Sequence, residues 1–297
     1  MKPLRAQIAL HATVVVFGFT GVLGKLITLS AVPLVFWRTL IGAAGLYLWL
    51  LLRRGDWPRI PLRRRCGIMG TGILVAVHWV TFFGAIKAST VSLALSVMAT
   101  APMFVAFIEP VVRRKRIDGG EVLLGLFALL GLWWMYRVDV DYGYGMLLAL
   151  MSAFCAALFG TLNSVWGQSV ASLAVSRIEL LAACVSLGLW MSLTGLWNQA
   201  MPNPSDAAWL LLLGLVATSL AFALIVEVMK VLSPFTVAMA INLEPVYAIL
   251  LALFVFGAEE VMPPGFYGGA TILICTVFLD AWLKRRRNSR KKEGASA

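Results

Sequence analysis

Two ionisable side chains lie deep inside apolar runs of the sequence. His78 lies near the middle of the run 67–87, and Glu244 directly precedes Pro245 inside the run 234–256. In a lipid bilayer such groups are rare, and they usually face a cavity or a partner side chain. A histidine can bind or pass on a proton, and a carboxyl can do the same or attract a cationic ligand. These residues therefore indicate a polar site inside an apolar bundle.

Both residues also have a structural interpretation. A neutral His78 could hydrogen-bond a hydroxyl group of a neighbouring helix. A protonated Glu244 could bond backbone groups left without partners next to Pro245. Because ionisable groups at mid-membrane depth usually face a cavity, we expect His78 to line one. For Glu244 the two alternatives stay open.

A polar stripe precedes a proline in the run 91–112. Ser92, Ser96 and Thr100 recur every four residues, share one helical face and lead to Pro102. In lipid, the carbonyls that a proline leaves without donors need partners in protein or in a water-filled cavity. Hydrogen bonding between helices is the simpler explanation of the stripe. Its position at a proline kink favours a cavity instead.

Further residues complete a candidate ligand site. Trp79, Phe82 and Phe222 offer an apolar wall suited to an aromatic group. The predicted binding residues are His78, Trp79, Phe82, Ser96, Thr100, Asn163, Phe222, Met239, Asn242 and Glu244, with Pro102 and Pro245 as hinges. Two arginines also lie within apolar runs, Arg38 and Arg177. For both we expect the side chain to extend along the helix toward the membrane surface.

The composition identifies the elements that must position these residues. Of 297 residues, 61% are hydrophobic and 13% are charged, whereas a soluble domain carries about 25% charged residues. Apolar runs of about twenty residues predict membrane-spanning helices. Ten spans are predicted: 7–28, 33–52, 67–87, 91–112, 120–136, 143–166, 172–197, 206–230, 234–256 and 264–283. We expect spans one, three, four, six, eight and nine to line the cavity.

The distribution of positive charge predicts the topology. Most of the 25 Lys and Arg residues fall on one side of this layout, together with both termini. An excess of Lys and Arg marks the cytoplasmic side, so both termini should be cytoplasmic and the number of spans even. The net charge of +11 is then a topology signal, strengthened by attraction to anionic lipid. It does not require a nucleic-acid partner.

The sequence also contains a weak internal repeat. The segments Lys87–Pro102 and Lys230–Pro245 match in both their first and last residues, and Arg38 has a counterpart in Arg177. The Arg-rich loop 53–65 corresponds to a loop without Lys or Arg, as expected when an odd number of spans inverts the second copy. We predict an all-α membrane protein of ten transmembrane helices in two inverted five-helix repeats, 1–139 and 140–284. A basic cytoplasmic tail, 285–297, follows them.

Other classes of protein fit the sequence less well. The chain has 4 Cys and 2 His, and the cysteines lie inside spans or beside an arginine run, so we expect no disulfide framework, metal site or cofactor. An intramembrane enzyme would need a nucleophile with an activating base, and His78 has no such partner motif. A channel or signalling receptor is a third class, although no extramembrane segment is long enough for a signalling domain.

Several short motifs resemble the drug/metabolite transporter superfamily, in its ten-helix EamA-like bacterial exporter branch. The matching residues are Phe17-Gly18 with Lys25, Pro33 with Arg38, Phe83–Ala94, Pro102, Glu244-Pro245-Val246, Gly257-Ala258-Glu259 and Gly268-Gly269. The chain departs from the family pattern after the fourth span, where Arg113–Arg116 replaces a usual glutamate. Over nearly the whole chain, the sequence resembles bacterial aromatic amino-acid exporters most.

The resemblance implies a secondary carrier that exports small amphipathic metabolites, aromatic amino acids first, across the bacterial inner membrane by alternating access. Its partners would be a small-molecule substrate and the lipid bilayer, with proton coupling left open, and we expect a monomer. The alternatives are a facilitative, channel-like pore and a transporter of other drugs or metabolites. By the same resemblance, spans 120–136 and 264–283 form a peripheral pair outside the cavity.

Overall fold

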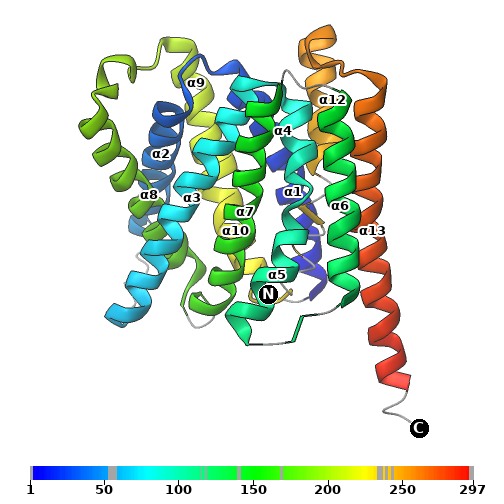
Figure 1. Ribbon diagram of the computed structural model, residues 1–297. Helices are drawn as coiled ribbons and strands as arrows, with labels where there is room; N and C mark the ends of the chain where they lie inside the picture. Colours follow the sequence, from blue (N-terminus) through cyan, green and yellow to red (C-terminus); the bar gives the residue numbers. More distant parts are fainter. Residues whose placement is uncertain are drawn as a thin grey trace.

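A computed structural model gives the fold of the protein (Figure 1). It describes residues 3–52, 59–114, 116–117, 119–138, 142–167, 170–232, 237, 240–241 and 244–293. Within these ranges the chain is a bundle of helices and contains no strand.

The first half of the chain contains α1 (Pro3–Leu26), α2 (Ala31–Leu52), α3 (Leu62–Ala88), α4 (Val91–Met98), α5 (Ala101–Arg113) and α6 (Gly119–Val138). The second half contains α7 (Gly143–Trp166), α8 (Ser172–Thr194), η2 (Leu196–Gln199), α9 (Pro204–Leu212), η3 (Leu213–Leu220), α10 (Ala221–Val228), α12 (Glu244–Phe256), η4 (Gly257–Glu260) and α13 (Pro264–Glu293). The segment η3 is a π-helix, and it continues α9 into α10 without a loop.

The described helices are those of a multi-pass membrane protein. Seven segments are long and apolar enough to cross a bilayer, counting α4–α5 and α9–α10 as one segment each. Large apolar side chains such as Leu52, Leu193 and Phe254 are exposed on the outside of the bundle, where lipid would cover them. Two further predicted spans coincide with α6 and α13, and one with α12 in part. The total of ten remains a prediction.

The fourth predicted span is broken at the expected place. The helix ends after Met98 and restarts at Ala101, so that Pro102 falls in the first turn of α5. Proline is tolerated there because the first-turn N–H groups have no partner within a helix. Pro245 lies in the helical backbone of α12, and residues 242 and 243 before it lie outside the described part of the chain. The hinge role of both prolines stays a prediction.

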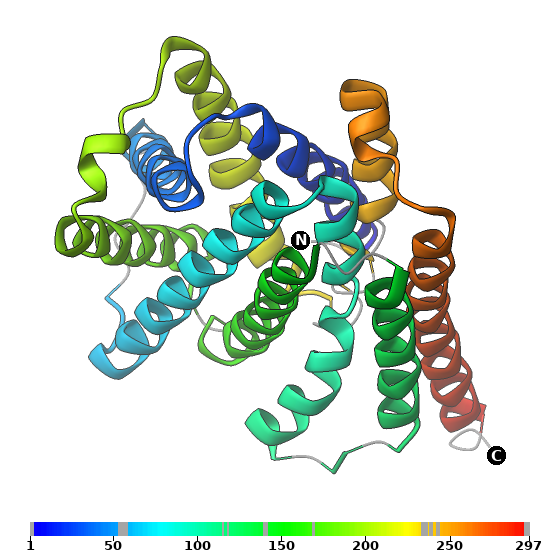
Figure 2. The same cartoon turned by 45° about the horizontal axis from the view of Figure 1, so that its top comes forward.

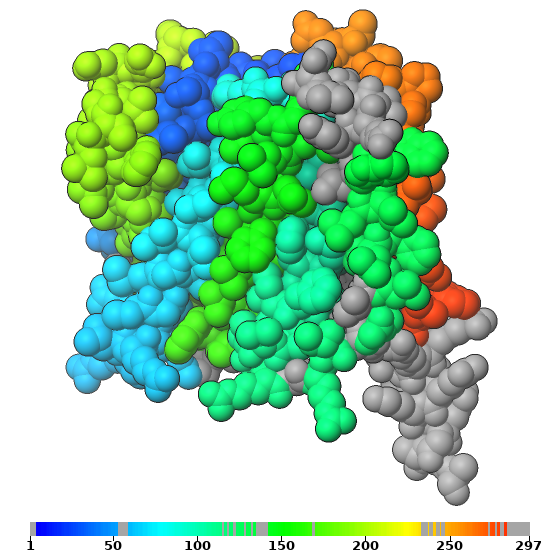
Figure 3. All heavy atoms as spheres, in the orientation of Figure 1, coloured from blue at the N-terminus to red at the C-terminus, as the bar shows by residue number. Residues whose placement is uncertain are grey.

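The packing places α3 in the middle of the bundle. It lies against α7 on one side and α8 on the other, while α1 lies between α10 and α12 (Figure 2). The contact of α3 with α8 is very close at Gly72, where a Cβ atom would come within 2.5 Å of the backbone oxygen of Glu179. On the face shown in Figure 3, α7 lies between α3 and α5.

The helices α6 and α13 form a pair at the edge of the bundle. The resemblance predicted this arrangement for the spans 120–136 and 264–283. In Figure 2 the pair stands beside α5 and α12, away from α2 and α8. The pair therefore lies at the periphery, as predicted for these two spans.

Candidate binding cavity

A cavity of about 160 Å³ lies in the centre of the bundle. Its walls come from α1, α2, α3, α4, α5, α7 and α10, the residues Val237 and Ile241, and the start of α12. These include helices of every predicted cavity-lining span, with α2 in addition. A dry apolar cavity of roughly 150 Å³ can hold a benzene molecule. This cavity is therefore large enough for a small metabolite.

His78 lines the cavity from α3 and is held by the facing helix α7. Its Nδ1 lies 3.0 Å from the backbone oxygen of Ser152. A carbonyl oxygen only accepts hydrogen bonds, so Nδ1 carries the proton and Nε2 of a neutral ring is an acceptor. Among the described residues nothing bonds to Nε2. The predicted cavity position and the structural bond to a serine thus occur together.

Ser152 fixes the histidine from a second direction. Its hydroxyl donates to the backbone oxygen of His78 at 2.9 Å and lies 2.8 Å from Nδ1. The ring of Phe159 packs against the imidazole, with centroids 5.5 Å apart. The ring orientation of His78 is therefore set by α7 before any ligand binds.

Aromatic side chains form much of the cavity wall. Trp79 of α3 meets Phe222 of α10 edge-on, with ring centroids 5.7 Å apart. Phe82 and Phe159 line the cavity as well, and Phe17 adds a ring from α1. Rings in such T-shaped contacts are favourable beyond their buried area. The predicted aromatic wall of Trp79, Phe82 and Phe222 is present in the cavity.

Arg38 lies in the cavity wall, contrary to the expectation that its side chain would extend to the membrane surface. The residue is 2% exposed, and its Nε donates to Thr218 Oγ1 at 2.7 Å. The guanidinium carbon lies 3.9 Å from the centre of the Trp79 ring. Arg38 lies about two turns inside α2, too deep to reach the helix end easily. That depth is the sequence signal that could have identified it.

The π-helical turn η3 positions Thr218, whose hydroxyl accepts the hydrogen bond from Arg38 Nε. Thr218 Oγ1 donates to the backbone oxygen of Leu213, and Ser219 Oγ lies within bonding distance of the backbone oxygens of Gly214 and Gly42. In a π-helical turn the backbone N–H groups bond to carbonyls five residues earlier, and here the two hydroxyls reach carbonyls at the same separation. Such turns often occur at functional sites. Nothing in the apolar sequence of this segment predicted the turn.

Glu244 lines the cavity from the first turn of α12. Its carboxyl group and the Arg38 guanidinium lie close enough to interact electrostatically. Among the described residues, however, the two groups make no contact ion pair. The cavity thus contains one cationic group and one carboxyl group that do not touch each other.

The polar stripe of α4 does not line the cavity. Ser96 and Thr100 are buried, and Thr100 Oγ1 donates to the backbone oxygen of Val97 at 2.8 Å. The cavity is lined instead by Leu95 and Ala99, which form the neighbouring stripe on the same helix. One residue corresponds to a rotation of about 100° around a helix. The spacing of the polar residues does not specify this rotation.

The remaining predicted site residues either lie outside the cavity or are not fully described by the structure. Asn163 lies in a small separate hollow beside Lys230, near the buried carboxyl group of Glu179. Pro102 does not line the cavity, although Ala101 beside it does. Met239 and Asn242 lie outside the described residues. For Pro245 the structure describes the helical backbone.

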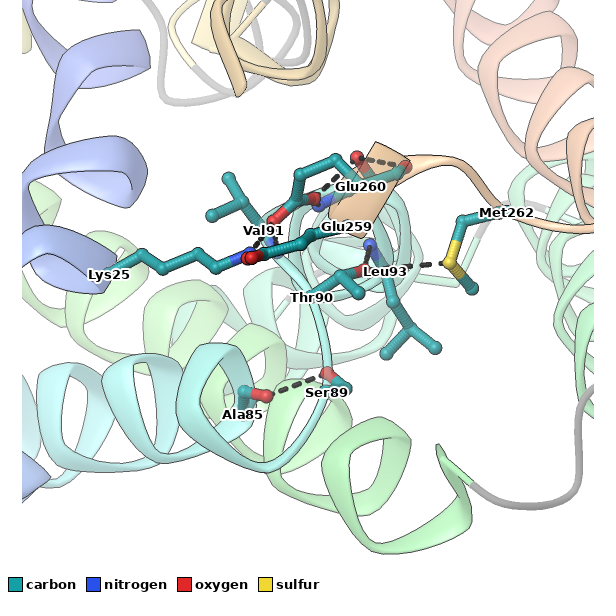
Figure 4. Close-up of polar contacts among 10 residues, drawn as sticks. Lys25, Ala85, Ser89, Thr90, Val91, Leu93, Glu259, Glu260 and Met262 are labelled. Atoms are coloured by element: carbon teal, nitrogen blue, oxygen red, sulfur yellow. Dashed lines mark hydrogen bonds and ion pairs between the residues drawn. The ribbon is translucent and has the colours of Figure 1, made fainter. Parts of the chain in front are cut away.

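A polar network closes the bundle where α1 ends and α4 begins (Figure 4). Lys25 Nζ lies 2.9 Å from Glu260 Oε1. The other oxygen of Glu260 accepts from the backbone N–H and the hydroxyl of Ser92, at 2.9 and 2.8 Å. The backbone N–H of Val91 donates to Oε1 at 3.1 Å. We call these residues, with Glu259, the Lys25–Glu260 network.

This network follows from helix chemistry. The first N–H groups of a helix lack partners within it, and a carboxylate there is favoured by the helix dipole. Glu260 supplies that carboxylate to α4 from the distant segment η4 and is 0% exposed. Beside it, Thr90 caps α4 by accepting from the backbone N–H of Leu93 at 3.0 Å.

A second polar contact lies near the same end of the bundle. Asp206 at the start of α9 accepts from both the backbone N–H and the hydroxyl of Thr28, each at 2.7 Å. Lys87 Nζ donates to the backbone oxygen of Ile27 at 2.8 Å. At this end, the connection between α1 and α2 is thus hydrogen-bonded to α9, and the start of α4 is hydrogen-bonded to η4. Both α9 and η4 belong to the second half of the chain.

Within the described residues, no group of three or more His, Cys, Asp or Glu side chains could hold a metal ion. The cysteines described there are free. The site therefore consists of hydrogen-bonding, charged and aromatic side chains.

Comparison with known proteins identifies the family. The model of the EamA-like transporter family matches this chain twice, over residues 4–137 and 143–280. The uncharacterized transporter YwfM of Bacillus subtilis is 25% identical over 92% of this chain and 93% of its own length. The uncharacterized transporter YxxF of the same organism is 22% identical over 83% of this chain and 80% of its own length.

A solved crystal structure has the same fold. It superposes with a TM-score of 0.70 at 17% identity, covering 96% of this chain and all of the other. The family matches cover most of the sequence, and the central cavity lies between helices of both matched segments. This chain belongs to the EamA-like transporter family and is a multi-pass membrane transporter.

Proposed function

We propose that this transporter exports small amphipathic metabolites across the bacterial inner membrane. Its substrates in this proposal are amino acids, with aromatic amino acids favoured. The observation that carries the proposal is the central cavity, which combines an aromatic wall with a fixed histidine acceptor and a carboxyl group. Trp79, Phe82 and Phe222 would contact the aromatic ring of a substrate. His78 Nε2 and Glu244 would meet its ammonium group.

The transport cycle in this proposal is alternating access between two inverted halves, 1–139 and 140–284. The family match to two successive segments supports a duplication. The break in the helix before Pro102, with Pro245 at the matching place in the second half of the sequence, supports it as well. In transporters with inverted repeats, broken helices at matching positions meet at the substrate site, and the halves rock around it. The basic loops would place both termini in the cytoplasm.

In this orientation the Lys25–Glu260 network lies at the outer end of the protein. It ties η4 of the second half to α1 and α4 of the first half. Export requires that this end open, so the network would break during each cycle and re-form afterwards. Protons are an open second partner, since both His78 and Glu244 can bind one. We expect a monomer to suffice for transport.

Uptake of labelled phenylalanine and tryptophan into liposomes containing the purified protein tests the proposal. Saturable uptake, together with faster exchange when unlabelled substrate is present on the other side, is expected of a carrier. Uptake that never saturates and shows no exchange would indicate a channel-like pore. Uptake equal to that of empty liposomes under every gradient would reject amino-acid transport. A panel of other drugs and metabolites would then identify the substrate.

A further inference from the structure

Arg38 is a buried charge that donates one hydrogen bond to the described residues. A guanidinium group carries several N–H donors in one plane and stays protonated. Nε donates to Thr218 Oγ1, but no described residue accepts a hydrogen bond from the two terminal nitrogens. Because Arg38 lines the cavity, a ligand there can reach these donors.

The surroundings of Arg38 hold the charge in place without neutralising it. The face of the guanidinium lies over Trp79 at 3.9 Å and within 5.4 Å of Phe83. Such cation–π contacts stabilise a desolvated arginine, but they occupy its face and leave its N–H edge free. A buried cation without a direct counterion is unfavourable in a low-dielectric interior. A bound anion would relieve that cost.

Glu244 provides a carboxyl group to the same cavity. Its carboxyl group interacts with Arg38 electrostatically but makes no contact ion pair with it. The carboxylate and the ammonium group of an α-amino acid are separated by a single carbon atom. A zwitterion can therefore lie between the arginine and the glutamate and satisfy both.

We propose that Arg38 binds the carboxylate of the substrate and thereby restricts the transporter to molecules that carry an anionic group. The inference rests on the proposed function and makes it more specific. The terminal N–H groups of Arg38 donate two parallel hydrogen bonds to the carboxylate, and the ammonium group lies toward Glu244 and His78. A simple amine without a carboxylate is repelled by the guanidinium. Amine drugs are therefore poor substrates.

Competition against labelled phenylalanine on the wild-type protein is the first test. Phenylalaninamide and 2-phenylethylamine keep the ring and the amine but lack the carboxylate. Hydrogen bonds to charged groups are strong, so both should compete about 10- to 100-fold more weakly than phenylalanine. Equal competition by phenylalanine and phenylalaninamide would overturn the role of Arg38. Absence of phenylalanine binding would instead reject the proposed function.

Substitutions then test whether Arg38 causes the preference for phenylalanine over phenylalaninamide. Arg38→Gln should lose the preference for phenylalanine over phenylalaninamide, and Arg38→Lys should keep part of it, because lysine retains the charge but not the planar edge. Thr218→Val removes the hydroxyl that accepts the hydrogen bond from Arg38 Nε. This change should weaken the binding of phenylalanine more than the binding of 2-phenylethylamine. Preference ratios equal to wild type in all three variants would contradict the proposal.

Arg177→Gln is the matched control. Arg177 is the counterpart of Arg38 in the second half of the sequence and does not line the cavity. Its replacement should leave the preference for phenylalanine over phenylalaninamide unchanged. An equal loss of preference in Arg177→Gln and Arg38→Gln would show that the effect is not specific to the cavity.

Discussion

The Lys25–Glu260 network and the central cavity use similar side chains but satisfy them to different degrees. In the network, both carboxylate oxygens of Glu260 have partners on α1 or α4. In the cavity, Arg38 and Glu244 do not touch, and His78 Nε2 has no partner among the described residues. A fully bonded cluster stabilises one closed arrangement of helices. Incompletely bonded groups provide binding capacity for a ligand.

The difference also separates the energetic roles of the two regions. Leaving a buried polar group without a partner costs about 1–3 kcal/mol, and more for a charged group. The cavity carries this cost in the absence of ligand, whereas the network avoids it. Substitutions in the network should therefore act first on stability and on access to the cavity. Substitutions in the cavity should act first on substrate affinity.

The largest effect is expected from Glu260→Ala. The change leaves Lys25 without its closest partner and removes the acceptor of the Val91 and Ser92 backbone N–H groups. Removing one member of a buried ion pair costs roughly 3–5 kcal/mol. Because Lys25 is 22% exposed, we expect the lower end of that range. The midpoint of thermal unfolding in detergent should fall by several degrees.

The same variant should also make the cavity more accessible from the outer side. Phe17→Cys introduces a thiol into the cavity wall and can be combined with replacement of the native cysteines. A membrane-impermeant thiol reagent added outside should label this cysteine faster in the Glu260→Ala background. Equal labelling rates together with unchanged stability would contradict the role of the network in closing this end.

Glu244→Gln should have the largest effect among the cavity substitutions. The amide keeps the size of the side chain but cannot carry the negative charge that attracts an ammonium group. We expect the KM for phenylalanine transport to rise about 10- to 100-fold, the range of a hydrogen bond to a charged group. Inhibition by 3-phenylpropionate, which has no amine, serves as the control and should not weaken. Equal losses for both compounds would remove Glu244 from the ammonium site.

His78→Ala should have a smaller effect. A neutral acceptor contributes about 0.5–1.5 kcal/mol, which corresponds to a change of roughly 2- to 10-fold in affinity. The KM for phenylalanine measured in liposomes should rise by that amount. Ser152→Ala, which leaves the ring but removes one of its contacts from α7, should show part of the effect. If all substrate kinetics stay unchanged in His78→Ala, the residue does not belong to the site.

The fold could be predicted from the sequence where a single strong physical signal determined it. Runs of about twenty apolar residues identified the helices, and Pro102 identified the break between α4 and α5. The π-helical turn at Leu213–Leu220 was not predictable, because its sequence is ordinary for an apolar helix. It depends on contacts with another helix, such as that of Ser219 with Gly42.

The same distinction applies to the cavity. His78 and Glu244 stood out because ionisable residues are rare at mid-membrane depth. Ser96 and Thr100 do not line the cavity. The rotation of α4 about its axis decides which side of the helix faces the cavity, and the spacing of the polar residues does not encode that rotation. Arg38 was misjudged because a long side chain can extend in either direction. Trp79 and Thr218, which come from other helices, decide the outcome.

The smallest effect is expected from Glu259→Gln. Comparing this variant with substitutions of Glu260 tests whether burial makes the ion pair of Glu260 with Lys25 important for stability. Glu259 adjoins Glu260 in the sequence and also approaches Lys25, at 3.3 Å, but its side chain is 74% exposed. Exposed ion pairs contribute about 0–1 kcal/mol and are screened by salt. The midpoint of thermal unfolding should therefore change by at most a degree or two, and the change should vanish at high ionic strength. Glu260→Gln, which removes the same charge from the buried neighbour, should remain clearly destabilised in high salt. Similar shifts in the two variants would mean that the network acts through the charge of Lys25 alone, without the bonds that Glu260 makes to α4.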